Sequence, residues 1–253
     1  MLIINPVIVE PLTREWEEKR AEIGTQMRKA HTHKSKGERT KAENEAKRLH
    51  IEFVERLKNF RVLDPACGSG NFLYLALKEL KNIEHRVNIE CEQLGLPRGF
   101  PVVGPECVKG IEINPFAAEL ARVSVWIGEI QWMREHGFDA SRNPILKPLE
   151  TIECRDALLN EDGSEAEWPE ADVIIGNPPF LGRKLLRDGL GGDYVETIFD
   201  VYDGRVPAEA DLVVYWFAKA WESTSHSEDP MRIGLVATKE PLNNAANMAQ
   251  LGD

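Results

Sequence analysis

Cysteine is scarce in this chain: its 253 residues include four, none in a CxxC pair and none with a histidine at metal-ligand spacing. The pattern does not favour a disulfide framework or a zinc site, so we expect no bound metal and a reduced, cytoplasmic setting. No apolar run approaches the roughly 20 residues that span a bilayer. The N-terminus has no basic segment and no small-residue cleavage site. We therefore expect neither a membrane span nor an export signal.

Basic residues are also fewer than acidic ones: the chain has 31 Lys and Arg and 42 Asp and Glu, which gives a net charge of −11. Residues 1–60 hold 13 basic and 10 acidic residues, whereas residues 101–253 hold 13 and 27. A protein that binds nucleic acid alone usually shows a basic footprint, since neutralised phosphates supply much of the affinity. Composition alone therefore predicts no nucleic-acid partner, unless a local basic rim or a part outside this chain binds the nucleic acid.

The spacing of apolar residues changes near residue 60. Residues 12–58 are highly charged, with apolar positions at helical spacing on both sides of the polar stretch 31–40. This pattern predicts two helices joined by a turn. From Phe60 onward, short apolar runs alternate with helical patterns. We therefore divide the chain into a charged helical extension, residues 1–59, and a second domain, residues 60–253.

Strands alternate with helices in the second domain, which predicts the α/β class, a parallel sheet with helices on both faces. The predicted strands cover residues 61–64, 108–113, 151–154, 171–177 and 232–238. The predicted helices cover residues 71–94, 115–137 and 211–222, and the second of them carries an apolar stripe through Leu120, Val123, Trp126, Ile127 and Ile130.

The segment DPACGSGNFL, residues 64–73, follows the first predicted strand and opens a helix. In an open α/β sheet this is where the backbone receives a nucleotide-like ligand. Gly68 and Gly70 permit a tight turn with no Cβ between backbone and ligand. Asp64 can accept hydrogen bonds from an ammonium group, and the loop lacks the Lys and the GKS or GKT ending of a phosphate loop. Taken alone, the segment is interpreted equally well as a structural turn.

Two further carboxylates stand at the ends of predicted strands. Glu112 ends the second strand, where an acidic side chain can bind both hydroxyls of a ribose. Asp156 lies just beyond the third strand, where it can accept a hydrogen bond from the exocyclic amine of adenine. Taken singly, Glu112 is interpreted as a solvated carboxylate and Asp156 as a helix N-cap.

The segment NPPF, Asn177 to Phe180, follows the fourth predicted strand directly. Pro178 and Pro179 fix the backbone, so the Asn177 amide oxygen and the Pro178 carbonyl oxygen are two preplaced acceptors. They suit the two N–H bonds of an exocyclic amine. Phe180 offers a face on which a flipped-out base stacks, worth roughly 1–3 kcal/mol. A proline-stiffened turn with a core phenylalanine is the alternative, but four ordered signals at strand ends favour a site.

These motifs occur in the order DPACGSGNFL, GIEIN, ECRDALL and NPPF, and they resemble motifs I to IV of adenine-N6 DNA methyltransferases of restriction–modification systems. The stretches around them, including YDGRVPAEADLVVYWFAKAWE, resemble the methyltransferase region of MmeI-like type II enzymes, from about residue 5 to residue 238. The resemblance implies a Rossmann-like fold that uses S-adenosyl-L-methionine and acts on double-stranded DNA by direct in-line transfer. It makes residues 60–253 the catalytic domain.

The resemblance also implies roles for individual residues. The methionine side of the cofactor is expected to lie against Asp64, Pro65, Ala66, Gly68, Gly70, Asn71 and Phe72. The ribose is expected on Glu112, and the cofactor's adenine on Ile113, Asp156 and Ala157. The flipped base is expected against Asn177, Pro178, Pro179 and Phe180.

The sequence departs from the family pattern after Thr238. We therefore expect an incomplete sheet and a chain that is a truncated piece of a larger enzyme, whose target-recognition and nuclease regions are its partners. Past the NPPF segment, Arg183, Lys184 and Arg187 are candidate phosphate contacts, with a solvated loop as the equal alternative.

Three other functions fit parts of the pattern. Methyltransferases of protein glutamine and of RNA bases also carry NPP-aromatic loops, although their glycine loops usually differ. Cytosine-N4 transfer uses the same geometry, with Ser more common at the position of Asn177. A non-catalytic remnant or subunit would only bind cofactor or partner chains and would use residues 12–58 as an interaction surface.

Overall fold

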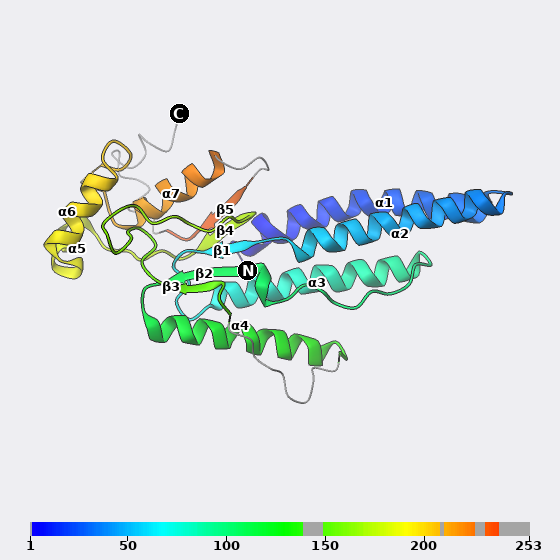
Figure 1. Ribbon diagram of the computed structural model, residues 1–253, viewed down its shortest axis with the longest axis horizontal. Helices are drawn as coiled ribbons and strands as arrows, with labels where there is room; N and C mark the ends of the chain where they lie inside the picture. Colours follow the sequence, from blue (N-terminus) through cyan, green and yellow to red (C-terminus); the bar gives the residue numbers. More distant parts are fainter. Residues whose placement is uncertain (1, 139–148, 208–209, 226–230, 238–253) are drawn as a thin grey trace. The chain divides into compact units, whose positions relative to one another are not determined.

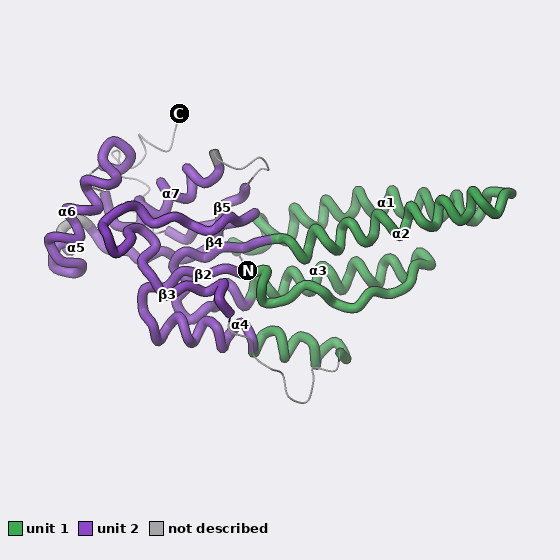
Figure 2. The backbone as a smooth tube through the Cα atoms, viewed as in Figure 1, with its two compact units in different colours: residues 1–60, 75–107, 127–145 green, residues 61–74, 108–126, 146–253 purple. Residues whose placement is uncertain are grey.

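Figure 1 shows the computed structural model of the chain, which describes residues 2–138, 149–207, 210–225 and 231–237. By its internal contacts the chain divides into two compact units (Figure 2). Unit 1 holds residues 1–60, 75–107 and 127–145, and unit 2 holds residues 61–74, 108–126 and 146–253. The predicted domain boundary after residue 59 lies one residue before the point where the chain first leaves unit 1, after Phe60. Two later segments return to unit 1. The domain boundary stays a prediction.

Unit 1 contains a helical hairpin. A short π-helical turn, η1 (Asn5–Val9), leads into α1 (Glu10–Thr32), and α2 (Lys36–Lys58) follows. The turn is shorter than the predicted stretch 31–40, because helix continues through Thr32 and resumes at Lys36. The apolar positions of the hairpin face inward: Trp16 and Phe53 are buried, with ring centroids 5.2 Å apart.

Unit 2 contains a sheet of five parallel strands in the order β3-β2-β1-β4-β5. The strands are β1 (Val62–Asp64), β2 (Val108–Glu112), β3 (Ile152–Cys154), β4 (Val173–Gly176) and β5 (Arg232–Leu235). Every strand predicted from apolar runs is present, although each is shorter than its run. The α/β prediction is thereby confirmed. Residues after 237, where the sequence departs from the family pattern, lie outside the described part.

Helices α3 (Asn71–Gln93), α4 (Pro115–Glu135) and α7 (Val213–Ser225) connect these strands. From β1 the chain steps through β2 to β3 on one side, and from β4 to β5 on the other. Right-handed crossovers in opposite directions place their helices on opposite faces. Figure 1 shows the strands in this order, from β5 beside α7 to β3.

The buried face of α4 is not the predicted apolar stripe. Leu120, Val123 and Ile127 are exposed, whereas Ala118 and Ala121 are fully buried. Ala118 and Ala121 allow the start of the helix to approach the glycine loop closely, and Val125 and Trp132 continue the same buried face. The apolar stripe in the sequence therefore does not mark the buried face.

The sequence did not predict two helices between β4 and α7, namely α5 (Arg183–Leu190) and α6 (Gly192–Val201). Val195 and Ile198 of α6 are buried in the core of unit 2, together with Tyr202. A 3-10 turn, η2 (Pro105–Cys107), precedes β2. Among the described helices, none is long and apolar enough to cross a membrane.

Candidate active site

The predicted motifs meet at the carboxyl edge of the sheet. Strand β1 pairs with β2 on one side and with β4 on the other. The register aligns Asp64 with Gly110 and Leu63 with Ile174. Parallel strands end at the same edge, so the loops after β1, β2 and β4 are neighbours. This edge is where ligands bind in open α/β sheets.

The loop after β1 turns sharply because two glycines adopt positive φ. Gly68 has φ 54° and Gly70 has φ 81°. A Cβ on Gly68 would meet nothing within 4 Å, so this side of the loop is open. A Cβ on Gly70 would lie 2.9 Å from the Ala121 Cα. Gly70 is therefore required for its backbone conformation and for packing of α4, whereas Gly68 leaves room for a ligand.

Asp64 is completely buried at the end of β1. Its Oδ1 accepts a hydrogen bond from the Ala66 N–H at 3.1 Å, but its Oδ2 is buried with no hydrogen-bond partner among the described residues. Burial, together with the nearby Glu112 carboxylate, raises the pKa of Asp64 to about 7, although the hydrogen bond from the Ala66 N–H lowers it. An unpartnered buried carboxylate oxygen is costly, so it indicates a place where a cationic group binds.

Glu112 connects the loops after β1 and β2. Its Oε2 accepts from the Gly68 N–H at 2.8 Å, and its Oε1 accepts from the Asn114 N–H at 2.8 Å. The carboxylate therefore does not stand free in solvent. Each oxygen retains a lone pair for one further donor, which suits a pair of ribose hydroxyls.

Asp156 follows β3, and no helix begins there, so the helix N-cap interpretation was wrong. Its Oδ1 instead accepts from the Leu158 N–H at 2.7 Å, which closes a turn. Its Oδ2 accepts from the Tyr194 hydroxyl at 2.6 Å. The Arg155 N–H donates to the Glu112 carbonyl at 3.1 Å, which fixes this segment beside the end of β2.

The NPPF segment begins directly after Gly176, the last residue of β4. A Cβ on Gly176 would lie 2.7 Å from the Asp64 Oδ1. The NPPF loop therefore starts in contact with the buried carboxylate of the glycine loop. Asn177 is exposed and Pro178 is buried, and Phe180 is 40% exposed. The exposed amide and the exposed ring are accessible to a substrate beside Asp64.

Residues 39–245 match the family model described as MmeI, DNA-methyltransferase domain. The chain belongs to this family. The resemblance inferred from the motifs is thereby confirmed.

Two curated relatives support the assignment. DNA methyltransferase A of Bacillus subtilis (strain 168) is 33% identical over 172 residues, which cover 65% of this chain and 19% of the relative. Type II methyltransferase M.BstVI of Geobacillus stearothermophilus is 28% identical over 176 residues, which cover 68% of this chain and 28% of the relative. The chain thus spans less than a third of the length of these relatives.

A solved structure has the same fold. This chain aligns with a TM-score of 0.58 and 22% identity to a structure described as the type IIL restriction-modification enzyme MmeI in complex with DNA. The alignment covers 87% of this chain and 27% of that chain. At this level of identity the likeness shows the fold.

The remaining predicted cofactor residues of the methyltransferase domain surround the same edge. Asn71 opens α3 and is exposed, Phe72 and Ala66 are partly buried, Pro65 and Ala157 are buried, and Ile113 is 67% exposed. An isoleucine this exposed at a strand end leaves apolar surface for a ligand to cover.

Sequence analysis missed three aromatic side chains that hold these loops. The Trp216 indole N–H donates to the Pro65 carbonyl at 3.2 Å, and the Trp168 indole N–H donates to the Ala157 carbonyl at 2.7 Å. Tyr194, described above, is the third. The sequence pattern does not reveal these contacts, because two of the three pairs lie 38 and 151 positions apart along the chain.

The predicted phosphate contacts lie around α5. The Arg187 guanidinium forms an ion pair with Glu196 of α6, so its charge is partly neutralised. The side chains of Arg183 and Lys184 lie outside the described part of the structure. All three DNA contacts stay predictions.

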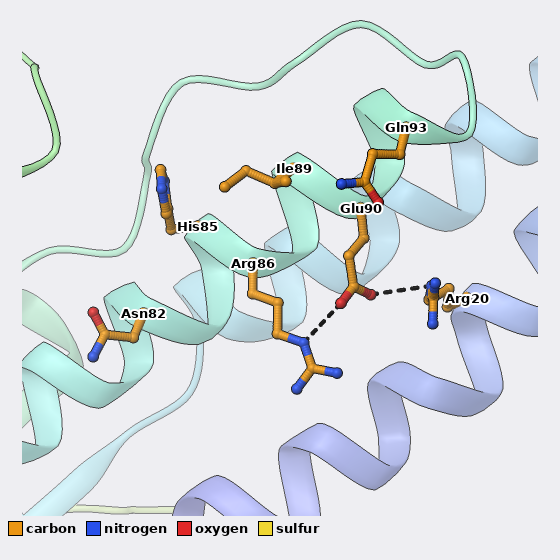
Figure 3. A pocket seen from close by; sticks show the side chains of 7 residues that line it. All are labelled: Arg20, Asn82, His85, Arg86, Ile89, Glu90 and Gln93. Atoms are coloured by element: carbon orange, nitrogen blue, oxygen red, sulfur yellow. Dashed lines mark hydrogen bonds and ion pairs between the residues drawn. The ribbon is translucent and has the colours of Figure 1, made fainter.

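A separate depression of about 420 Å³ lies in unit 1 (Figure 3). Within it, Glu90 pairs with Arg20 at 3.1 Å and with Arg86 at 2.8 Å. The depression is lined by Arg20, Asn82, His85, Arg86, Ile89, Glu90 and Gln93. None of the predicted site residues lines it, so we assign it no part in the site.

Proposed function

We propose that the chain transfers a methyl group from S-adenosyl-L-methionine to the N6 amine of adenine in double-stranded DNA. The observation that carries the proposal is the contact between Gly176 and Asp64. It brings the start of the NPPF segment against the loop that suits a cationic, nucleotide-like ligand, and this supports the proposal. Methyl transfer needs this proximity, because in-line displacement requires the two reacting atoms to be held about 3–3.5 Å apart.

The chain's residues fit this methyl donor. The unpartnered Oδ2 of Asp64 suits the donor's ammonium group. Glu112 suits the ribose hydroxyls, and exposed Ile113 offers an apolar face to the adenine. Asp156 suits the exocyclic amine of that adenine. Gly68 leaves the backbone side of the loop open to the ligand.

The bound donor supplies a methyl group on a sulfonium, a leaving group that departs as a neutral thioether. The chain prepares the attacking nitrogen. Asn177 Oδ1 and the Pro178 carbonyl accept its two N–H bonds and draw its lone pair out of conjugation with the ring. As the N–C bond forms, the C–S bond breaks and the nitrogen then releases one proton. Phe180 stacks on the base, which must leave the duplex to reach this position.

The proposed setting is a restriction–modification system in the cytoplasm. The family and the curated relatives are DNA methyltransferases, one of them named as a type II enzyme. None of the four cysteines forms a disulfide, and three of them are buried. Cysteines without disulfides agree with a reducing compartment. We propose target-recognition and nuclease regions of the same enzyme as partners of this domain.

The test is methyl incorporation followed by product analysis. The chain is incubated with duplex DNA of mixed sequence and methyl-labelled donor, and the DNA is digested to nucleosides. We expect label in N6-methyldeoxyadenosine. Label in N4-methyldeoxycytidine would overturn the adenine assignment, and label in added RNA or protein alone would overturn the choice of DNA. Donor binding without incorporation into any acceptor would support the cofactor-binding remnant instead.

A further inference from the structure

Tyr194 makes a contact that the proposed chemistry does not yet use. It lies in α6, 38 positions beyond Asp156, and its hydroxyl donates to the Asp156 Oδ2 at 2.6 Å. This distance is within the range of about 2.5–2.7 Å that is typical of a hydroxyl bound to an ionised carboxylate. Burial, with the hydrogen bond to Asp156, raises the pKa of Tyr194 far above its usual range. The hydroxyl therefore keeps its proton and acts as a donor.

The other oxygen of Asp156 is held as well. Its Oδ1 accepts from the Leu158 N–H at 2.7 Å, with a longer contact to the Leu159 N–H at 3.5 Å. Because both oxygens accept hydrogen bonds, the carboxylate cannot rotate without losing at least one of them. A carboxylate offers about four lone-pair sites, so Oδ2 keeps one for a further donor. The two partners thus determine where that remaining acceptor points.

We propose that Tyr194 is a positioning residue for the methyl donor. Its hydroxyl orients the Asp156 carboxylate so that the free lone pair of Oδ2 accepts from the exocyclic amine of the donor's adenine. The inference rests on the proposed function. Tyr194 then determines how strongly the site distinguishes adenine from a purine without that amine. A correctly oriented acceptor binds the amine through a hydrogen bond and repels a carbonyl oxygen at the same position.

Tyr202, at the end of the same helix, provides a matched comparison. Its hydroxyl donates to the Leu158 carbonyl at 3.2 Å, and its side chain is fully buried. Both tyrosines therefore tie α6 to the segment after β3, but Tyr202 holds only the backbone. Val195 and Ile198 anchor α6 in the core through apolar contacts. Loss of the Tyr194 hydroxyl should therefore leave the helix in place.

The experiment compares two ligands by calorimetric titration. S-adenosyl-L-homocysteine carries the exocyclic amine, and S-inosyl-L-homocysteine carries a ring carbonyl at the same position. The preference is the ratio of their two Kd values. It is measured for the full chain and for Tyr194→Phe, Tyr202→Phe and Asp156→Asn, with the Tm of each variant.

We expect the unmodified chain to prefer the adenosyl ligand and Asp156→Asn to lose this preference. Tyr194→Phe should lower the preference by about three- to tenfold, the effect of one lost hydrogen bond. The loss should come from weaker adenosyl binding. Tyr202→Phe should change the preference by less than about twofold, even if its Tm falls.

The outcomes separate this inference from the proposed function. If the chain binds neither ligand, both fail. If it binds with a preference that Asp156→Asn removes and Tyr194→Phe retains, only the role of Tyr194 is overturned. A preference that survives Asp156→Asn would also overturn it. Equal losses of preference in Tyr194→Phe and Tyr202→Phe would show that the contact supports the fold in general.

Discussion

Buried charges around α3 in unit 1 and at the glycine loop of unit 2 differ in how they are partnered. In unit 1, Lys81 is buried, yet its ammonium group contacts the Val103 carbonyl and both oxygens of Glu129, each at 2.9 Å. Glu84, also buried, accepts from the Val102 and Val103 N–H groups at 2.7 and 3.1 Å. In unit 2, Asp64 is completely buried and one of its oxygens has no partner among the described residues.

The difference separates a structural role from a binding role. A buried charge that is paired and hydrogen-bonded has its desolvation cost offset within the fold. Lys81 and Glu84 therefore fix local structure and need no ligand. The Asp64 Oδ2 has no such partner among the described residues, so we expect a ligand to supply one. Substitutions in these two regions should consequently produce different kinds of loss.

The largest effect is expected at the catalytic loop. Asn177→Ala removes one of two acceptors for the attacking amine, so it should lower the rate of methyl transfer by at least about 100-fold. Because Asn177 does not contact the donor in the proposed arrangement, the Kd of S-adenosyl-L-methionine should stay within a few-fold. Single-turnover incorporation of label into DNA, with calorimetry on the same preparation, measures both. An equal loss of donor binding would mean that Asn177 belongs to the cofactor site.

A large effect of another kind is expected in unit 1. Lys81→Met removes the buried partner of the partly buried Glu129 carboxylate and should lower the free energy of unfolding by about 3 kcal/mol. Urea denaturation measures it, with Lys78→Met on the same helix as the control. If Lys81→Met leaves stability unchanged, the contrast between the units is broken, because the paired charge would then contribute nothing to structure.

The elements that the sequence predicted well carry local signals. Asp64, Glu112 and Asn177 each follow an apolar run directly, so the strand assignments alone placed them at one edge of the sheet. The missed features depend on partners remote in sequence. Tyr194 reaches Asp156 across 38 positions, and Trp216 reaches Pro65 across 151.

The face of α4 was missed for a different reason. Hydrophobicity alone identifies Leu120 and Val123 as core, whereas the structure buries Ala118 and Ala121. The close approach of Gly70 to Ala121 selects small residues there, and a sequence pattern does not show that approach. Gly189 interrupts the apolar spacing of α5, whereas Val195, Ile198 and Phe199 stand at helical spacing in α6, a signal that the sequence offered and the prediction did not use.

A smaller effect follows from the raised pKa of Asp64. Below a pH of about 7 the ligand-free carboxyl holds its proton, so binding of a cationic donor must release it. Between about pH 5.5 and 7 the affinity should rise with pH, approaching about tenfold per pH unit at the acidic end. Over the same window the stability of the ligand-free chain should fall, because the folded state holds a proton that the unfolded state has lost.

Asp64→Asn is the control for this dependence, since its side chain does not titrate. It should bind the donor weakly, with little change in affinity across the same window. Calorimetry at several pH values measures both proteins. A slope as steep in Asp64→Asn as in the unmodified chain would assign the titration to another group.

The smallest effect is expected on the surface of the hairpin. Arg48 pairs with Glu45 and Glu52, but its side chain is 59% exposed. Exposed ion pairs contribute little, because water and salt screen them. Arg48→Ala should therefore leave the Tm and the donor affinity unchanged within error in a thermal scan and a titration. A clear fall in Tm would mean that exposed pairs in unit 1 support the fold as buried ones do.

The most direct measurement is calorimetric titration of the 253-residue chain with S-adenosyl-L-methionine, beside Glu112→Ala. Binding in the micromolar range, roughly −8 kcal/mol, is expected. Glu112→Ala should weaken it by about tenfold or more, because the carboxylate holds the Gly68 loop and, in the proposed arrangement, receives the ribose. A folded chain that does not bind, or that binds equally well without Glu112, would contradict the assignment of this sheet edge as the methyl-donor site.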